Sequence, residues 1–265
     1  MKNKHTKEKT LSYKILLVIR IILILIIIGC LIYIGNWYIE NKKSAKMKEL
    51  TESSIIDTIS VQVPIIEEDG TESKTLEIIA YELDFDKLFS INSSTAGWIS
   101  VPNTTINYPV AQATDNAFYL NHSFDKSWNS AGWIFADYRN KFDGTDKNII
   151  VYGHNRMDSS MFATLKDTQN SNWYNNQDNK YITYTTPDGV NVYEVFSVYT
   201  IKAESYYLQT DFSNDASYLE FLKTLKSRSI HDFGVNLDED DQIITLSTCD
   251  ASGRSRVILH AKKIF

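Results

Sequence analysis

Thr245-Leu246-Ser247-Thr248-Cys249, near the C-terminus of this 265-residue chain, is the stretch that decides both the fold and the chemistry. It continues from the apolar pair Ile243-Ile244, which predicts a strand that ends at a thiol. Seven residues after the cysteine, Arg256 begins the apolar run 257–261, which predicts a second strand. A thiol at a strand end facing an arginine on the next strand combines a nucleophile with a group that stabilises negative charge.

His154, in the segment Tyr152-Gly153-His154, is the candidate general base and acid for that thiol. An imidazole titrates near neutral pH, so it can accept one proton and return it to a leaving amine. Two arginines compete for the charge-stabilising role. Arg256 lies inside a strand pattern, whereas Arg254 lies in the preceding loop, so Arg256 is the better-held candidate. Counting by twos, Cys249 shares a strand face with Ser247 and Thr245.

The N-terminal part predicts a membrane anchor. Residues 15–38 are almost wholly apolar, and at about 1.5 Å per residue they span a hydrocarbon core of roughly 30 Å. The run exceeds a signal-peptide core and no small-x-small cleavage site follows it, so we expect an uncleaved anchor. Lysines precede the span and acids follow it, which indicates a single-pass cell-membrane protein with a cytoplasmic N-terminus and the catalytic domain outside.

The expected organisation therefore has four parts. Residues 1–14 form a cytoplasmic tail, 15–38 the transmembrane anchor, 39–75 a stalk with a helical extension, and 76–265 the catalytic domain.

The cysteine count and the charge restrict the possible functions. Cys30 lies in the apolar span, so Cys249 is the single thiol outside it and has no partner for an internal disulfide. The thiol is then either an inert core residue or a functional one. Residues 39–265 hold 21 basic and 32 acidic residues without a basic stripe, which excludes nucleic acid as a partner. The histidine spacing and the one external cysteine give no zinc site, so we expect neither a metal nor a cofactor.

Short strand patterns separated by turn residues recur through the second half of the chain, which predicts a closed or nearly closed β-barrel. Before them, a short helix capped by Asp84 and two short strands at 61–66 and 75–81 are expected. One later helix, at 215–225, is expected to cover an end of the barrel. The barrel strands are expected at 97–101, 106–110, 131–135, 148–152, 181–185, 190–201, 242–248 and 256–264.

These motifs resemble those of a known family, the sortases. Thr-Leu-Ser-Thr-Cys at 245–249 matches the sortase signature TLxTC, Tyr152-Gly153-His154 matches the histidine segment, and Arg256 precedes three apolar residues as the sortase arginine does. Residues 119–124 and 131–139, together with the helix at 215–225, are similar to class B sortases in particular. The resemblance covers residues 84–265.

The resemblance implies a mainly β fold: an eight-stranded barrel with N-terminal helices, one helix inserted between strands 6 and 7, and a preceding transmembrane helix. It also implies a cysteine transpeptidase, in which Cys249 attacks the threonine carbonyl of an NPxT(N/G)-like sorting motif of a surface protein. His154 would protonate the leaving segment, and Arg256 would hold the substrate backbone and the oxyanion. An amine of a peptidoglycan precursor would then resolve the thioacyl intermediate. The groove residues implied by the resemblance are Asn116, Leu120, Tyr152 and Ser247.

Three other functions fit parts of the pattern. A pilin-polymerising sortase is the alternative within the family, although no segment resembles the Asp-Pro-aromatic lid of those enzymes. A thiol hydrolase would pass the acyl group to water instead of an amine. A non-catalytic, membrane-tethered barrel that binds surface-protein peptides would keep its biological effect without Cys249.

Overall fold

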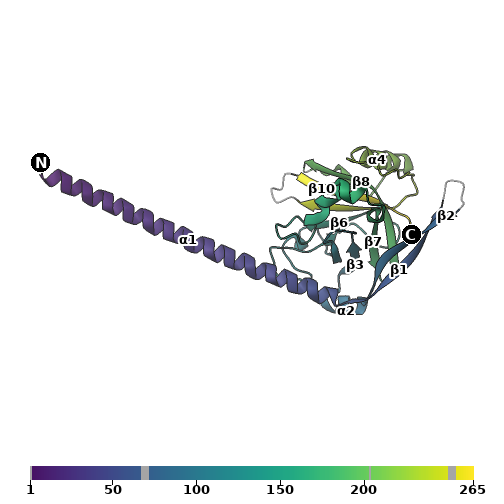
Figure 1. The fold of residues 1–265 in the computed structure, drawn as a ribbon, viewed down its shortest axis with the longest axis horizontal. Coiled ribbons are helices and arrows are strands. Elements are labelled where there is room, and N and C mark those ends of the chain that lie inside the picture. The colour runs from purple at the N-terminus through teal and green to yellow at the C-terminus, as the bar shows by residue number, and fades with distance from the viewer. Residues whose placement is uncertain (1, 67–71, 203, 250–254) are drawn as a thin grey trace. The chain divides into compact units, whose positions relative to one another are not determined.

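The computed structural model describes residues 2–66, 72–202, 204–249 and 255–265 (Figure 1). The chain divides into two compact units, residues 1–45 and 46–265, and each is described by itself. The α-helices are α1 (Lys2–Glu52), α2 (Phe85–Ile91), α3 (Ser171–Tyr174) and α4 (Asp215–Ser227). The short 3-10 helices are η1 (Phe118–Leu120), η2 (Ala163–Gln169), η3 (Gln177–Lys180) and η4 (Tyr206–Leu208). The strands are β1 (Ile55–Ile66), β2 (Glu72–Leu83), β3 (Thr95–Ser100), β4 (Asn107–Gln112), β5 (Phe135–Ala136), β6 (Asn148–His154), β7 (Tyr181–Thr186), β8 (Gly189–Lys202), β9 (Ile243–Cys249) and β10 (Ser255–Lys263).

Helix α1 contains the apolar span expected at 15–38. From Tyr13 to Glu52 it is long and apolar enough to cross a membrane. The helical extension expected over 39–75 is helical only as far as Glu52. After it, β1 and β2 form an antiparallel hairpin in which Val61 lies opposite Ile78. The strands expected at 61–66 and 75–81 lie within this hairpin. The alternation of apolar and polar residues there, as in Val61-Gln62-Val63, suits a strand and not a helix. The sequence Glu67-Glu68-Asp69-Gly70 predicts a turn between the two strands, and these residues lie outside the described part of the structure.

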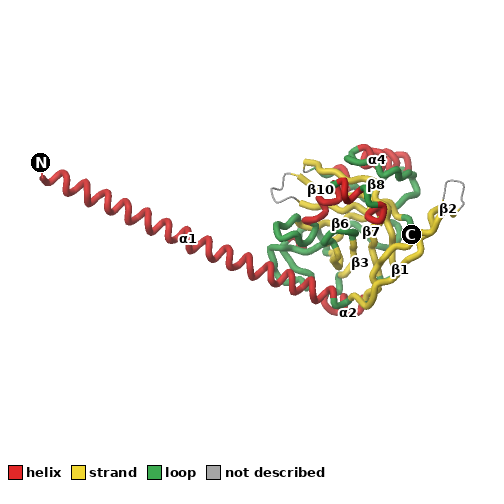
Figure 2. The backbone as a smooth tube through the Cα atoms, viewed as in Figure 1, coloured by secondary structure: helices red, strands yellow, loops and turns green. Residues whose placement is uncertain are grey.

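The remaining strands close into a barrel in the order β10-β8-β7-β3-β4-β5-β6-β9 (Figures 1 and 2). Two neighbouring pairs, β4–β5 and β6–β9, are parallel, and the other described pairs are antiparallel. Helix α4 lies between the sixth and seventh barrel strands in chain order. The eight-stranded barrel with an inserted helix that the sequence implied is therefore confirmed.

One barrel strand is much shorter than expected. The apolar run 131–135 predicted a full strand, but only Phe135 and Ala136 pair as β5. Gly132 has φ +62°, in the left-handed region, which interrupts an extended chain. The preceding residues are buried all the same, and the Trp133 amide donates to the Tyr119 carbonyl oxygen at 2.9 Å instead of to a neighbouring strand. This departure from strand geometry packs the 119–133 loop against the end of β6.

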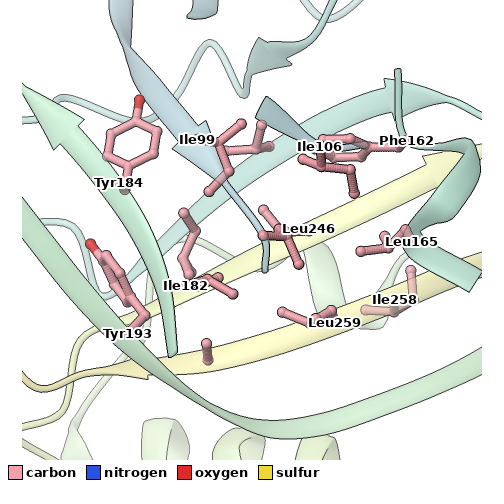
Figure 3. Packing of buried hydrophobic residues seen from close by; sticks show 14 of the residues in the cluster. Ile99, Ile106, Phe162, Leu165, Ile182, Tyr184, Tyr193, Leu246, Ile258 and Leu259 are labelled. Carbon is pink, nitrogen blue, oxygen red and sulfur yellow. The ribbon is translucent and has the colours of Figure 1, made fainter. Parts of the chain in front are cut away.

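The barrel interior is filled by branched aliphatic and aromatic side chains (Figure 3). Leu246 of β9 lies among Ile182, Ile258 and Leu259, and all four are fully buried. Burial of side chains of this size stabilises the fold by about 1.5–3 kcal/mol each. The expected helix cap at Asp84 is also present, since its side chain accepts a hydrogen bond from the Lys87 amide at the start of α2. The interior therefore fixes β9 in register, and with it the strand end at residue 249.

Candidate active site

Three neighbouring strands bring the sequence-predicted catalytic positions together at one end of the barrel. In the parallel pair β6–β9, His154 lies opposite Cys249. In the antiparallel pair β9–β10, Arg256 lies opposite the same cysteine. Adjacent strands lie about 4.8 Å apart. The backbone of Cys249 is thus flanked by His154 on one side and by Arg256 on the other. The side chain of Cys249 lies outside the described part of the structure.

The imidazole of His154 is held by the main chain of the loop before β5. Its Nε2 is 2.8 Å from the backbone carbonyl oxygen of Leu120. A carbonyl oxygen can only accept, so Nε2 carries the proton and donates it. Burial lowers the pKa of His154; the hydrogen bond to Leu120 opposes this effect, and the nearby charge of Arg156 adds to it. The neutral ring therefore keeps its lone pair on Nδ1.

Gly132 allows this loop to approach His154. A Cβ atom at position 132 would lie 2.7 Å from Cδ2 of His154, 2.6 Å from the Tyr119 carbonyl oxygen and 2.8 Å from the Leu120 carbonyl oxygen. Real Cβ atoms do not make contacts this short. Together with its left-handed φ, this close approach makes glycine the residue that fits beside the histidine.

Arg256 is half-buried, and one of its terminal nitrogens, Nη1, donates to the Ser255 carbonyl oxygen at 3.2 Å. Within residues 2–66, 72–202, 204–249 and 255–265, no carboxylate forms an ion pair with its guanidinium. Its charge is therefore not neutralised by any described acid. Arg254, the other candidate for this role, lies outside the described residues.

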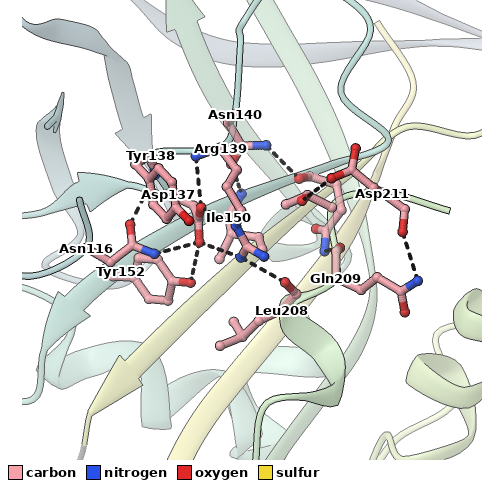
Figure 4. Close-up of polar contacts among 12 residues, drawn as sticks. Asn116, Asp137, Tyr138, Arg139, Asn140, Ile150, Tyr152, Leu208, Gln209 and Asp211 are labelled. Atoms are coloured by element: carbon pink, nitrogen blue, oxygen red, sulfur yellow. Dashed lines mark hydrogen bonds and ion pairs between the residues drawn. The ribbon is translucent and has the colours of Figure 1, made fainter. Parts of the chain in front are cut away.

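Two of the expected groove residues, Asn116 and Tyr152, are joined through a third residue that the sequence did not single out. The side-chain nitrogen of Asn116 and the hydroxyl of Tyr152 both donate to Oδ2 of Asp137, each at 2.8 Å (Figure 4). Burial raises the pKa of the Tyr152 phenol, and the charge of Asp137 raises it further. The Tyr152 phenol therefore stays protonated at neutral pH, and like the amide of Asn116 it is a neutral hydrogen-bonding group.

The other two expected groove residues are placed differently. Leu120 has 38% of its surface exposed, and its carbonyl oxygen is the group that binds His154. Ser247 is only 2% exposed, because Tyr207 of η4 covers it, with the two side-chain oxygens 3.0 Å apart. Ser247 is therefore buried in this structure, and it lies two residues from Cys249 on the same strand.

Four buried polar side chains, those of Asn148, Thr245, His260 and Tyr199, form a hydrogen-bonded chain beside Ser247. The Thr245 hydroxyl lies 2.9 Å from Nδ1 of His260 and donates to the Asn148 side-chain oxygen at 2.7 Å. Nε2 of His260 lies 2.9 Å from the Tyr199 hydroxyl. Burial lowers the pKa of His260 to about 3, so the ring is neutral. The complete burial of His260 fits a structural role for this side chain.

No group of three or more histidine, cysteine, aspartate or glutamate side chains that could hold a metal ion occurs within the described ranges.

Comparison with known proteins gives consistent matches. The sortase domain family matches residues 99–264. The chain is 35% identical over 182 residues to Sortase B of Listeria monocytogenes, a match that covers 67% of this chain and 72% of that protein. The crystal structure of Clostridium perfringens sortase B superposes with a TM-score of 0.65 at 38% identity and covers 69% of this chain and 100% of that one. A Staphylococcus aureus sortase B–substrate complex superposes with a TM-score of 0.64 at 36% identity, covering 68% of this chain and 84% of that one.

Proposed function

This chain belongs to the sortase family and is a class B cysteine transpeptidase, and on that premise we propose that Cys249, His154 and Arg256 are its catalytic residues. The observation that carries the proposal is the strand register, which sets His154 and Arg256 on either side of Cys249. Sortases act on surface proteins and use cell-wall amines as acceptors. The substrate here would be a surface protein with an NPxT(N/G)-like motif near its C-terminus.

The proposed reaction has two stages. Nδ1 of the neutral His154 accepts the proton of the Cys249 thiol. The resulting thiolate attacks the threonine carbonyl carbon, and Arg256 stabilises the negative oxygen that forms. The carbon–nitrogen bond after threonine then breaks, and His154 supplies the proton that the leaving amine needs. In the second stage an amine of a peptidoglycan precursor attacks the thioester. This step forms an amide and returns the thiol to Cys249.

The N-terminal helix supports a membrane location for this reaction. Helix α1 is long and apolar enough to cross a membrane, and lysines are concentrated before its apolar span. We propose that the N-terminus is cytoplasmic and that residues 46–265 lie outside the cell, where both the surface protein and the acceptor amine are available.

The test uses the full chain in detergent micelles and a fluorogenic peptide that contains an NPxT-type motif. Cys249→Ala should abolish cleavage, and His154→Ala should reduce kcat/KM by at least about 100-fold. Addition of an amine acceptor should divert the thioacyl intermediate from hydrolysis to amide formation. Mass spectrometry would detect the transfer product in place of the hydrolysis product. Equal cleavage by the parent and Cys249→Ala would contradict the proposed mechanism.

A further inference from the structure

Asp137 collects five hydrogen-bond donors on its two carboxylate oxygens (Figure 4). Oδ1 accepts from the backbone amide and from Nε of Arg139, at 3.0 and 2.8 Å. Oδ2 accepts from Asn116, from Tyr152 and from Nη2 of Arg139, each at 2.8 Å. A carboxylate can accept at about four lone-pair positions, so both oxygens are close to saturated. Only an ionised acid, which presents no donor of its own, matches this surrounding.

The burial of this acid is complete, and its charge is balanced locally. The side chain of Asp137 is 0% exposed, and Arg139 forms an ion pair with it at 2.8 Å. Burial alone would raise the pKa of Asp137, but the bonds from Arg139, Tyr152 and Asn116 outweigh it and lower that pKa. Loss of the Arg139 side chain would leave the buried carboxylate of Asp137 without its ion-pair partner and without the hydrogen bonds from Nε and Nη2. We call this pair the Asp137–Arg139 anchor: its acid is buried, and 36% of the side chain of its base is exposed.

The anchor fixes the orientation of the Asn116 amide. Its nitrogen donates to Asp137, and its oxygen accepts from the Tyr138 backbone amide at 3.0 Å. Both ends of the amide are thus assigned, and a flip would place two donors together at one end. The Tyr152 hydroxyl is likewise committed as a donor, so its oxygen remains as an acceptor toward any ligand.

The Asp137–Arg139 anchor also contacts the segment that covers β9. Nη2 of Arg139 also donates to the Leu208 carbonyl oxygen at 2.9 Å. The neighbouring Tyr207 contacts Ser247, two residues before Cys249. Four separate parts of the chain therefore meet at this ion pair: the segment before η1, β6, η4 and the turn after β5.

We propose that Asp137 is a positioning residue for the substrate groove, which it holds open in one arrangement by fixing Asn116, Tyr152 and, through Arg139, the Leu208 segment. This inference rests on the proposed function, because it assumes that a sorting peptide binds across Asn116 and Tyr152. It predicts that the effect of losing Asp137 falls on peptide binding and leaves the reactivity of the thiol intact.

The experiment compares two identical substitutions in the full chain, in a Cys30→Ser background. Asp137→Asn replaces one carboxylate oxygen with an NH2 group. This group would face the N–H and O–H donors that now bind the carboxylate. Asp146→Asn is the matched control, because Asp146 likewise accepts from backbone and side-chain donors, those of Lys141, Phe142 and Asn140, but from none of the groove residues. Peptide kinetics, iodoacetamide alkylation of Cys249 and hydrogen exchange of residues 115–121 and 204–210 are measured for each.

Asp137→Asn should raise KM about tenfold or more while the alkylation rate stays within about twofold of the parent. Exchange should become faster in both segments. Asp146→Asn should leave KM and the exchange of those segments unchanged. Tyr152→Phe should raise KM in the parent background but add little to Asp137→Asn, because the shared bond is already lost. If Asp137→Asn does not fold, Arg139→Gln, which breaks the Leu208 bridge, should show the same rise in KM and the faster exchange at 204–210.

Two results would overturn the inference. One is equal changes of KM in Asp137→Asn and Asp146→Asn, and the other is unchanged exchange in both segments. Failure of the proposed function looks different: the parent itself would not cleave the peptide. The exchange data would still decide whether Asp137 holds the two segments together.

Discussion

Nε2 of His154 donates a hydrogen bond to the backbone carbonyl oxygen of Leu120 across 2.8 Å. In a Ser-His-Asp triad a carboxylate orients the histidine and stabilises the charged ring that forms. A main-chain carbonyl can orient the ring in the same way, but it carries no full charge. The ring of His154 is therefore held in one tautomer without being strongly favoured as a cation.

The first prediction concerns the resting state of His154. Its pKa should lie below the ordinary value of 6.5, since burial disfavours the charged ring. The unfolded chain then binds a proton more readily than the folded one, so acidification just below pH 6.5 should reduce stability through this residue. Nitrogen-15 spectra of labelled histidine should show a neutral ring with the proton on Nε2 at pH 7. A charged ring at that pH, or a proton on Nδ1, would contradict the assignment.

The second prediction concerns the glycine beside this histidine. Gly132→Ala should reduce kcat/KM by at least about tenfold, because the new methyl group must displace His154 or the Leu120 carbonyl. The matched control is Gly144→Ala, which places a side chain at φ +84° with nothing within 4 Å. Both variants should lose a similar 1–2 kcal/mol or so of stability from the left-handed backbone. Peptide kinetics with thermal unfolding would separate the two effects, and equal activity losses would refute the role of Gly132.

The third prediction separates the two arginines. Arg256→Ala should lower kcat/KM by about 100-fold, in the range seen when one donor to an oxyanion is removed. Arg254→Ala should lower it by less than about tenfold, because the strand register places Arg256 opposite Cys249. The same fluorogenic assay measures both. A larger loss in Arg254→Ala would transfer the role to that residue.

The fourth prediction concerns His260, which burial keeps neutral by lowering its pKa to about 3. Between pH 6.5 and 3 the imidazole of residue 260 is protonated in the unfolded state but not in the folded state. Stability should therefore fall on acidification across this window, by up to about 1.4 kcal/mol per pH unit from this residue. His260→Gln should be less stable at pH 7, because Thr245 and Tyr199 lose their partner. Its urea-unfolding free energy should nevertheless vary less with pH than that of the parent, and equal slopes would refute the prediction.

The positions of the three proposed catalytic residues could be singled out in the sequence because each one ends or begins a strand with a strong apolar pattern. His154 closes one such run, Cys249 closes another and Arg256 opens a third. Pairing of β9 with β6 on one side and with β10 on the other is enough to bring the three positions together. The helix at 215–225 was equally clear, because its apolar face has helical spacing.

The contacts around those positions could not be predicted, because they depend on loops without a periodic pattern. Alternation placed Ser247 on the face of Cys249, but nothing in residues 204–212 indicates that Tyr207 covers it. The pair Asp137 and Arg139 is visible in the sequence as an acid and a base two residues apart. Its burial, however, results from four segments that meet only in the folded chain.

The parallel pairing of β6 with β9 has a consequence for biogenesis. Strands that lie 95 residues apart in the chain become neighbours, and β10 then seals the barrel a few residues from the C-terminus. Contacts so distant in sequence form late and slowly compared with local ones. A nascent or partly exported chain would therefore carry the histidine long before it has a thiol to activate. The proposed catalytic pair can therefore form only after β9 has paired with β6.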